Sequence, residues 1–291
     1  MVSDKSVLIT GIARNVARVI PKEIERIEKE FEKIFRSISF LVIESDSTDN
    51  TLELLKKIKQ NKQNFNYISL GKVEHTLPDR IERLAFCRNS YVKEIRNNDI
   101  YNNVDFVAVV DFDIKNNRLN LRELDVMINN FNNEWKAIFA NQTGLYFDIY
   151  ALRKDGWVEN DCFTEYEALS KSMKRQEAKE IAIWSKMKRI KKDSPLITVD
   201  SAFGGLGIYR RNVFIYFDYT LIPGRRHESE HVSLHKKIRD SNGLLLIVPK
   251  MTNFAWGTHN LSRFKFIRVL DQASNRKGFR KIRDLARKLL S

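Results

Sequence analysis

The first half of the chain alternates short apolar runs with stretches in which apolar residues recur at helical spacing. We interpret four runs as strands, at 7–9, 40–43, 65–70 and 106–110. The helical stretches begin at Pro21, after Asn50 and at Ile81, and proline and asparagine both suit a helix start. Strands that are apolar almost throughout and alternate with helices are typical of a parallel sheet covered on both faces. The pattern therefore predicts an α/β fold.

The second half is less regular. It predicts strands at 137–140, 145–152, 206–209 and 244–248, and a helix with a basic loop over 165–192. No linker rich in Pro, Gly or Ser and no internal repeat divides the chain. We expect one domain over residues 1–260, built from the halves 1–115 and 116–260, followed by a basic helical tail over 261–291.

Composition narrows the class of protein. Of the 291 residues 43% are hydrophobic, which argues against a disordered chain. Only Cys87 and Cys162 are available, so a disulfide framework and a paired-cysteine zinc module are excluded. No apolar run approaches the ~18 residues of a membrane span, and the N-terminus is too polar for a secretory signal. We expect a soluble, cytoplasmic protein.

The net charge of +14 favours an anionic partner, which can be nucleic acid, a phosphorylated ligand or an anionic membrane. In the tail, Phe279, Ile282, Leu285, Ala286 and Leu289 share one helical face among many basic residues. Such helices lie on anionic membrane surfaces, so we expect peripheral contact with the inner membrane face. The open alternative is a helix that docks on the domain.

Acidic residues follow two of the predicted strands. Glu44 and Asp46 follow the second strand, and Asp111 and Asp113 follow the fourth. Ligands of open α/β sheets bind at the carboxyl ends of the strands, and paired carboxylates there suit Mg²⁺ with substrate phosphates. Acidic residues are also common in turns and helix caps after strands. Neither a GxxxxGK[ST] loop nor a GxGxxG fingerprint is present.

Arg88 falls on the apolar face of the helix predicted over 81–95. A buried guanidinium is costly unless it is paired, and its available partners are the acidic strand ends or a bound diphosphate. The alternative is a surface arginine at the edge of the helix.

Four segments together resemble nucleotide-sugar-dependent glycosyltransferases of the GT-A fold. They are Glu44–Thr51 (ESDSTDNT), Arg83–Asn89 (RLAFCRN), Asp111–Asp113 (DFD) and Tyr146–Arg153 (YFDIYALR). The closer resemblance is to the fungal capsule-associated α-1,3-mannosyltransferase family and its bacterial and viral relatives. It spans roughly residues 7 to 260, and each motif is short.

The resemblance implies a GT-A-like, Rossmann-like, mostly parallel sheet and a DxD-type enzyme of polysaccharide biosynthesis. The donor would be a UDP- or GDP-sugar, the acceptor a glycan or a lipid-linked molecule, and the cofactor Mn²⁺ or Mg²⁺. The residues that would bind the donor are Gly11, Ala13, Arg14, Glu44, Asp46, Arg88 and Asp111. The metal ligands would be Asp111, Asp113 and the late histidine His259.

Candidates for the catalytic carboxylate are Glu230, Glu228 and Asp148. For the first two, a solvated helix start is the competing interpretation. His231 and His235 are four residues apart, without the HExxH order of a zinc protease. The pair Gly204-Gly205 suits either close approach of a sugar or a tight turn.

Two other functions stay open at this point. A nucleic-acid-binding protein would account for the charge, although the basic residues are dispersed and form no recognised motif. A nucleotidyltransferase would use the same carboxylates on a nucleoside triphosphate.

Overall fold

A computed structural model describes residues 3–113, 119–131, 134–224 and 228–253. Its strands form one eight-stranded sheet in the order β3-β2-β1-β4-β7-β5-β8-β6. The strands are β1 (Ser3–Ala13), β2 (Phe35–Glu44), β3 (Phe65–Ser69), β4 (Phe106–Val110), β5 (Ala137–Gln142), β6 (Ile197–Thr198), β7 (Leu206–Arg210) and β8 (Leu245–Asn253).

The pairings β3-β2, β2-β1, β1-β4 and β5-β8 are parallel. Strand β7 is antiparallel to both β4 and β5, and β6 is antiparallel to β8. The prediction of an α/β fold with a mostly parallel sheet is therefore confirmed. In the sheet, β2 and then β3 lie on one side of β1, and β4 lies on the other side.

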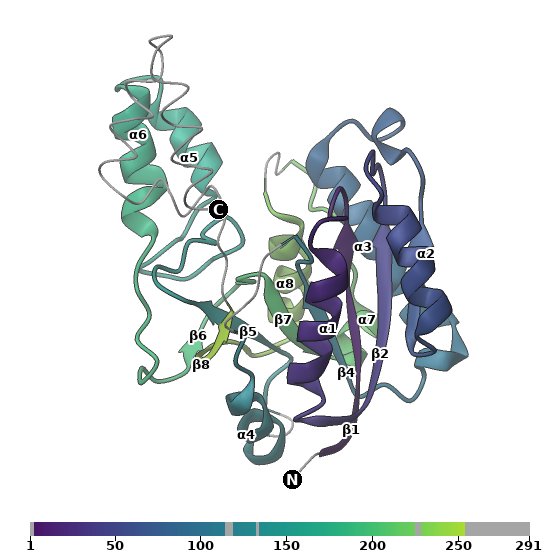
Figure 1. The fold of residues 1–291 in the computed structure, drawn as a ribbon. Coiled ribbons are helices and arrows are strands. Elements are labelled where there is room, and N and C mark those ends of the chain that lie inside the picture. The colour runs from purple at the N-terminus through teal and green to yellow at the C-terminus, as the bar shows by residue number, and fades with distance from the viewer. Residues whose placement is uncertain (1–2, 114–118, 132–133, 225–227, 254–291) are drawn as a thin grey trace.

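Helices cover both faces of the sheet (Figure 1). The α-helices are α1 (Ile20–Phe31), α2 (Thr51–Asn61), α3 (Arg80–Asn97), α4 (Arg122–Asn130), α5 (Cys162–Leu169), α6 (Arg175–Ala182), α7 (Arg211–Tyr216) and α8 (Glu230–Asp240). Single 3-10 turns lie at Val73–His75, Asp99–Tyr101 and Trp184–Lys186.

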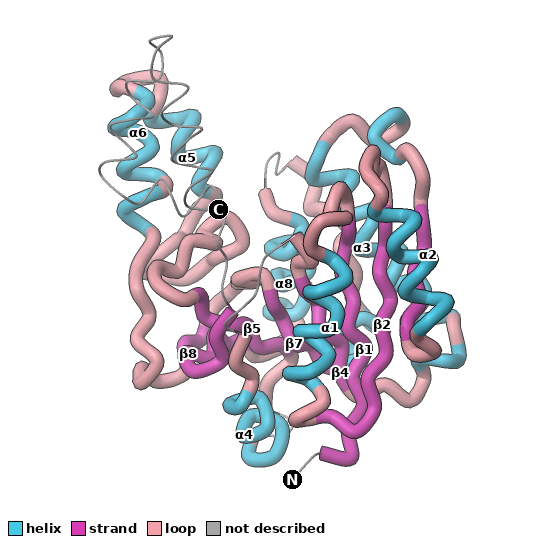
Figure 2. Tube along the Cα trace, viewed as in Figure 1, coloured by secondary structure: helices cyan, strands magenta, loops and turns pink. Residues whose placement is uncertain are grey.

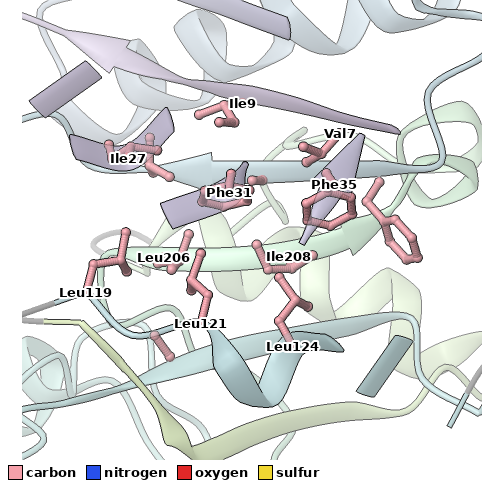
Figure 3. Close-up of a cluster of buried hydrophobic side chains, with 14 of the residues drawn as sticks. Val7, Ile9, Ile27, Phe31, Phe35, Leu119, Leu121, Leu124, Leu206 and Ile208 are labelled. Atoms are coloured by element: carbon pink, nitrogen blue, oxygen red, sulfur yellow. The ribbon is translucent and has the colours of Figure 1, made fainter. Parts of the chain in front are cut away.

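The core has two layers because side chains alternate along each strand. Val7 and Ile9 of β1 pack with α1 and α4, whereas Leu8 packs on the opposite face with α3, α7 and α8. Figure 3 shows the first layer, in which Ile27 and Phe31 of α1 lie near side chains of the strands. The buried positions of α1 recur at helical spacing, so its apolar stripe faces the sheet.

The structure corrects three sequence predictions. The segment 145–152 is irregular, because Gly144 has a positive φ and the Gln142 side chain accepts backbone hydrogen bonds from Phe147 and Asp148. The helical spacing of apolar residues after Pro21 continues through Ile34 and Phe35 and predicts a longer first helix, but the helix ends at Phe31 and Phe35 begins β2. The region 165–192 holds two helices, α5 and α6, which project from the sheet (Figure 1).

No helix in the described ranges is long and apolar enough to cross a membrane. The tail predicted over 261–291 and the proposed metal ligand His259 lie outside the described residues.

Candidate active site

A cavity of about 450 Å³ opens at the carboxyl ends of β1, β2 and β4. In Figure 2 the loops that follow β1 and β2 meet at the same edge of the sheet. Because β1 continues to β2 on one side and is flanked by β4 on the other, this edge is the topological switch point where α/β sheets bind ligands. The predicted residues among those that line the cavity are Ala13, Arg14, Asp46, Arg88, Asp111, Asp113, Asp148 and Glu230.

The wall after β1 and β2 is built around Asp46. Its backbone adopts φ +58°, and its Oδ1 accepts a hydrogen bond from the backbone N–H of Glu74 at 2.9 Å. Its Oδ2 is buried, has no hydrogen-bond partner in the described part of the chain, and lies 3.9 Å from Arg83 Nε. Arg14, at the rim, pairs with Glu74. This wall thus holds the buried Asp46 carboxylate together with the guanidinium groups of Arg14 and Arg83, and all three residues line the cavity.

Two residues assigned to the donor lie elsewhere. Neither Gly11 nor Glu44 is among the described residues that line the cavity. A Cβ on Gly11 would lie 2.1 Å from the carbonyl oxygen of Val110, so the glycine permits the close approach of β4 to β1. The carboxylate of Glu44 accepts hydrogen bonds from Ser47 N at 3.1 Å and from Ser69 Oγ. Both residues shape the strand ends that carry the cavity.

The acidic pair after β4 faces the cavity from its floor. Burial and the neighbouring Asp113 carboxylate raise the pKa of Asp111 well above its usual range, although Arg88 acts in the opposite direction. Asp113 is exposed. Two carboxylates that line one cavity and repel each other fit a hard divalent cation, which often takes one or two carboxylates and completes its shell with substrate phosphates. The described residues contain no group of three or more metal-ligating side chains.

Arg88 occupies the centre of the site, on α3. Its side chain is only 4% exposed, and its Nε donates to Glu230 Oε1 at 2.8 Å. Its Nη2 lies 4.0 Å from Asp111 Oδ1, whereas Nη1 is buried without a hydrogen-bond partner in the described part of the chain. The guanidinium also lies over the rings of Phe203 and Tyr219. The predicted buried and paired arginine is confirmed, and the surface alternative is wrong.

The three candidate catalytic carboxylates take different places. Glu230 begins α8, lines the cavity and is buried against Arg88. Asp148 also lines the cavity, but its Oδ2 accepts the backbone N–H of Gly204 at 2.7 Å. Burial raises the pKa of Asp148. Glu228 is not among the described lining residues and lies 3.8 Å from the buried Arg153.

The interpretation of Glu228 and Glu230 as a solvated helix start is wrong for both residues, since both are buried. At the glycine pair, both residues have positive φ, and a Cβ on Gly204 would lie 2.6 Å from Ala140 O. Gly204 thus makes a tight turn, while Gly205 lines the cavity.

The two histidines of α8 differ in position, because His231 lines the cavity whereas His235 is buried and is not among the described lining residues. Burial and the Arg88 charge lower the pKa of His235 to about 3. Ser201 Oγ donates to the Ala151 carbonyl at 2.6 Å, so His235 Nδ1 donates to Ser201 Oγ, and His235 Nε2 accepts from Tyr209. His231 stacks on Phe203 at 4.0 Å between ring centroids and lines the cavity. Burial also lowers the pKa of His231 well below its usual range.

The sequence interpretation missed several lining residues. Arg83 and Cys87 lie in the same RLAFCRN segment as Arg88, and their spacing of four residues, which places them on one helical face, was a usable signal. Phe203 directly precedes the glycine pair that the sequence singles out, whereas nothing in the local sequence marks Gln142.

Neither protein-family models nor curated proteins match the chain. Three similar solved structures are the mannosyltransferase PcManGT from Pyrobaculum calidifontis in complex with GDP-Man and Mn²⁺, S. aureus TarS in complex with UDP, and M. tuberculosis glucosyl-3-phosphoglycerate synthase. Their identities are 12%, 14% and 14%, and their TM-scores are 0.48, 0.46 and 0.43. The alignments cover 94%, 91% and 87% of this chain and 67%, 63% and 72% of those chains.

These are distant likenesses to glycosyltransferase structures, so the function is argued below from the residues of this chain. No family model matches that would confirm the narrower resemblance to the fungal capsule-associated family, which stays a prediction.

Proposed function

We propose that the protein is a metal-dependent glycosyltransferase that moves a sugar from a UDP- or GDP-sugar to a hydroxyl of a glycan or lipid-linked acceptor. One observation carries the proposal. A single cavity at the switch point of the sheet places the Asp111 and Asp113 carboxylates, the buried Arg88 and the buried Glu230 around one ligand-sized space.

The donor's nucleotide would lie against the wall formed by Ala13, Arg14 and Asp46, which follows β1 and β2. Its diphosphate would then reach the floor at Asp111 and Asp113. Arg88 lines the cavity, and its Nη2 lies 4.0 Å from Asp111 Oδ1, so the guanidinium places positive charge beside the region where the diphosphate would lie.

The residues present fit a divalent cation. Asp111 and Asp113 would hold Mn²⁺ or Mg²⁺, because these carboxylates are adjacent, face the cavity and repel each other in its absence. When bound, the metal supplies positive charge that stabilises the leaving diphosphate. The metal would need no third protein ligand if oxygen atoms of the donor phosphates complete its coordination shell.

Among the three candidate carboxylates, we assign the role of general base to Glu230. It faces the cavity, whereas Glu228 lies by Arg153 and Asp148 holds the Gly204 turn. In the reaction Glu230 accepts the proton of the acceptor hydroxyl, the hydroxyl oxygen bonds to the anomeric carbon, and the bond from that carbon to the diphosphate breaks. Arg88 orients the carboxylate through its 2.8 Å hydrogen bond.

Donor and metal binding test the proposal directly. Thermal-shift measurements with GDP-mannose and with UDP-sugars, each with and without Mn²⁺, are expected to raise the melting temperature only when sugar nucleotide and metal are both present. Asp113→Ala is expected to abolish the metal-dependent part of the shift and donor turnover while the free variant stays folded, since Asp113 is exposed.

Two results would contradict the proposal. One is full donor hydrolysis by Asp113→Ala with metal chelated. The other is a larger shift with nucleoside triphosphates than with any sugar nucleotide, which would favour a nucleotidyltransferase.

A further inference from the structure

Five cations occur within seven residues of the segment that follows α6, at positions 186–192. Lys186 pairs with Glu165 of α5. The other four are exposed and form no ion pair with any described residue; we call them the basic ridge, and they are Lys188, Arg189, Lys191 and Lys192. Runs of charged residues are usually solvated and mobile. The basic ridge can act as a binding surface if its backbone is held by hydrogen bonds to the rest of the protein.

The backbone of this segment is fastened to the protein at alternate residues. The carbonyl of Lys186 accepts from Trp157 Nε1 at 2.7 Å, and that of Lys188 accepts from the backbone N–H of Tyr146 at 2.8 Å. The carbonyl of Ile190 accepts from Asn141 Nδ2 at 3.2 Å. Met187 and Ile190 pack against the core layer. The cations therefore project from a fixed backbone.

The backbone of the ridge is attached to segments that lead to the cavity, on the side of β5 and β8. Tyr146, which bonds to Lys188, is followed at once by Phe147 and Asp148, and both line the cavity. The residues assigned above to the nucleotide lie on the other side, after β1 and β2. A chain bound along the ridge would therefore reach the cavity from the side opposite the nucleotide.

We propose that the basic ridge binds an anionic glycan, the acceptor chain, through carboxylates or phosphates on its sugar units; this rests on the proposed function. Lys188 Nζ lies 5.8 Å from the centroid of the Trp157 ring, and none of the four cations has an ion-pair partner among the described residues. Within five residues they lie inside one or two Debye lengths at physiological salt and act together on a polyanion. Because their backbone is held in advance, binding does not have to order it. A neutral glycan gains nothing from this surface.

The test compares two variants that each remove four positive charges. The ridge variant is K188Q/R189Q/K191Q/K192Q, and the matched control is K22Q/K29Q/K57Q/K93Q, which neutralises exposed lysines of α1, α2 and α3. Binding of full-length protein to polygalacturonate, phosphomannan and neutral mannan is measured at 0.15 M salt. The ridge variant is expected to bind at least one anionic glycan tenfold or more weakly than wild type, and the control less than twofold. The tighter of the two anionic glycans in the wild type identifies carboxylate or phosphate.

Equal losses in both variants would overturn the proposal, because net charge alone would then explain binding. It is also overturned if phosphatidylglycerol vesicles or a single-stranded oligonucleotide bind the ridge more tightly than either anionic glycan. Thermal shifts with sugar nucleotide and Mn²⁺ are run on both variants. If the ridge variant keeps both the thermal shift with sugar nucleotide and its glycan binding, only this inference is rejected. If the wild type shows no thermal shift with any sugar nucleotide, the proposed function is rejected.

Discussion

Arg88 shows how one residue joins the two chemical sides of the cavity. It donates to Glu230 at 2.8 Å and lies 4.0 Å from Asp111, so its single charge offsets two carboxylates, one directly after β4 and one at the start of α8. A guanidinium has several donors in a rigid plane and can serve both partners without moving. The arginine is therefore a positioning residue for Glu230 as well as a candidate ligand for the donor.

Substitutions of Glu230 and Glu228 test which of the two residues acts in catalysis and which acts only in stability. Glu230→Gln is expected to lower kcat by about 10²–10⁴-fold with little change in the KM for donor, because it removes a base but keeps a hydrogen-bond acceptor for Arg88. Glu228→Gln is expected to keep kcat within about threefold and to lower stability by about 1–3 kcal/mol, because it weakens a buried ion pair with Arg153. Steady-state kinetics and urea unfolding of both variants give the comparison. A larger loss of kcat in Glu228→Gln would reverse the assignment.

Helix α8 joins Glu230, the proposed catalytic base, to a buried polar layer. Its first residue, Glu230, faces the cavity, while His235 lies one turn further on and is fully buried among Ser201 and Tyr209. A neutral imidazole satisfies this arrangement, because one ring nitrogen donates and the other accepts. The position of the helix is therefore coupled to the protonation state of His235.

This coupling predicts acid sensitivity. The pKa of His235 is about 3 in the folded protein and about 6.5 in an unfolded chain, so only the unfolded chain takes up this proton between those pH values. Its contribution to stability is present above pH 6.5 and is lost as pH falls, by about 2 kcal/mol between pH 6.5 and 4.5. Urea unfolding at both pH values is expected to show wild type losing about 2 kcal/mol more than His235→Gln. Parallel losses in the two proteins would refute the coupling.

At the scale of the whole molecule, the two halves predicted from the sequence share one sheet. Strand β7, which lies at residues 206–210, pairs with β4 on one side and with β5 on the other. All five residues of β4 are buried. The sheet of the first predicted half is thus completed by a strand from far along the chain, and the described strands of both predicted halves belong to one sheet.

A fragment of residues 1–115 is therefore expected not to fold alone. Without β7, β4 becomes an exposed apolar edge, and such edges aggregate. We expect the fragment to lack a cooperative unfolding transition and to elute as aggregates, whereas the full chain unfolds cooperatively. Circular dichroism with size-exclusion chromatography provides the measurement, and a monomeric, cooperatively folded fragment would show that the first half is an independent domain.

Most of the first half was predictable because its information is local. The apolar runs at 7–9, 40–43 and 106–110 became β1, β2 and β4, and the acidic residues after them came to one edge, as parallel strands require. The burial of Arg88 also followed from its place on a helical face. The second half was harder, because the irregular segment 145–152 is held by the side chain of Gln142, which the apolar pattern does not reveal.

The sequence by itself thus determines which chemically active side chains are present and which strand ends they follow. It can do so because helical and strand periodicities are read over a few neighbouring residues. Which carboxylate meets Arg88 was decided only by folding: Glu230 comes 142 residues later in the chain, and Glu228, two residues before it, lies by Arg153 instead. Folding also decided the roles of Gly11 and Glu44. Gly11 packs closely against the Val110 carbonyl of β4, and the Glu44 carboxylate accepts a hydrogen bond from Ser69 of β3. Contacts between distant segments depend on how the strands are ordered and packed, and that order is a property of the whole fold.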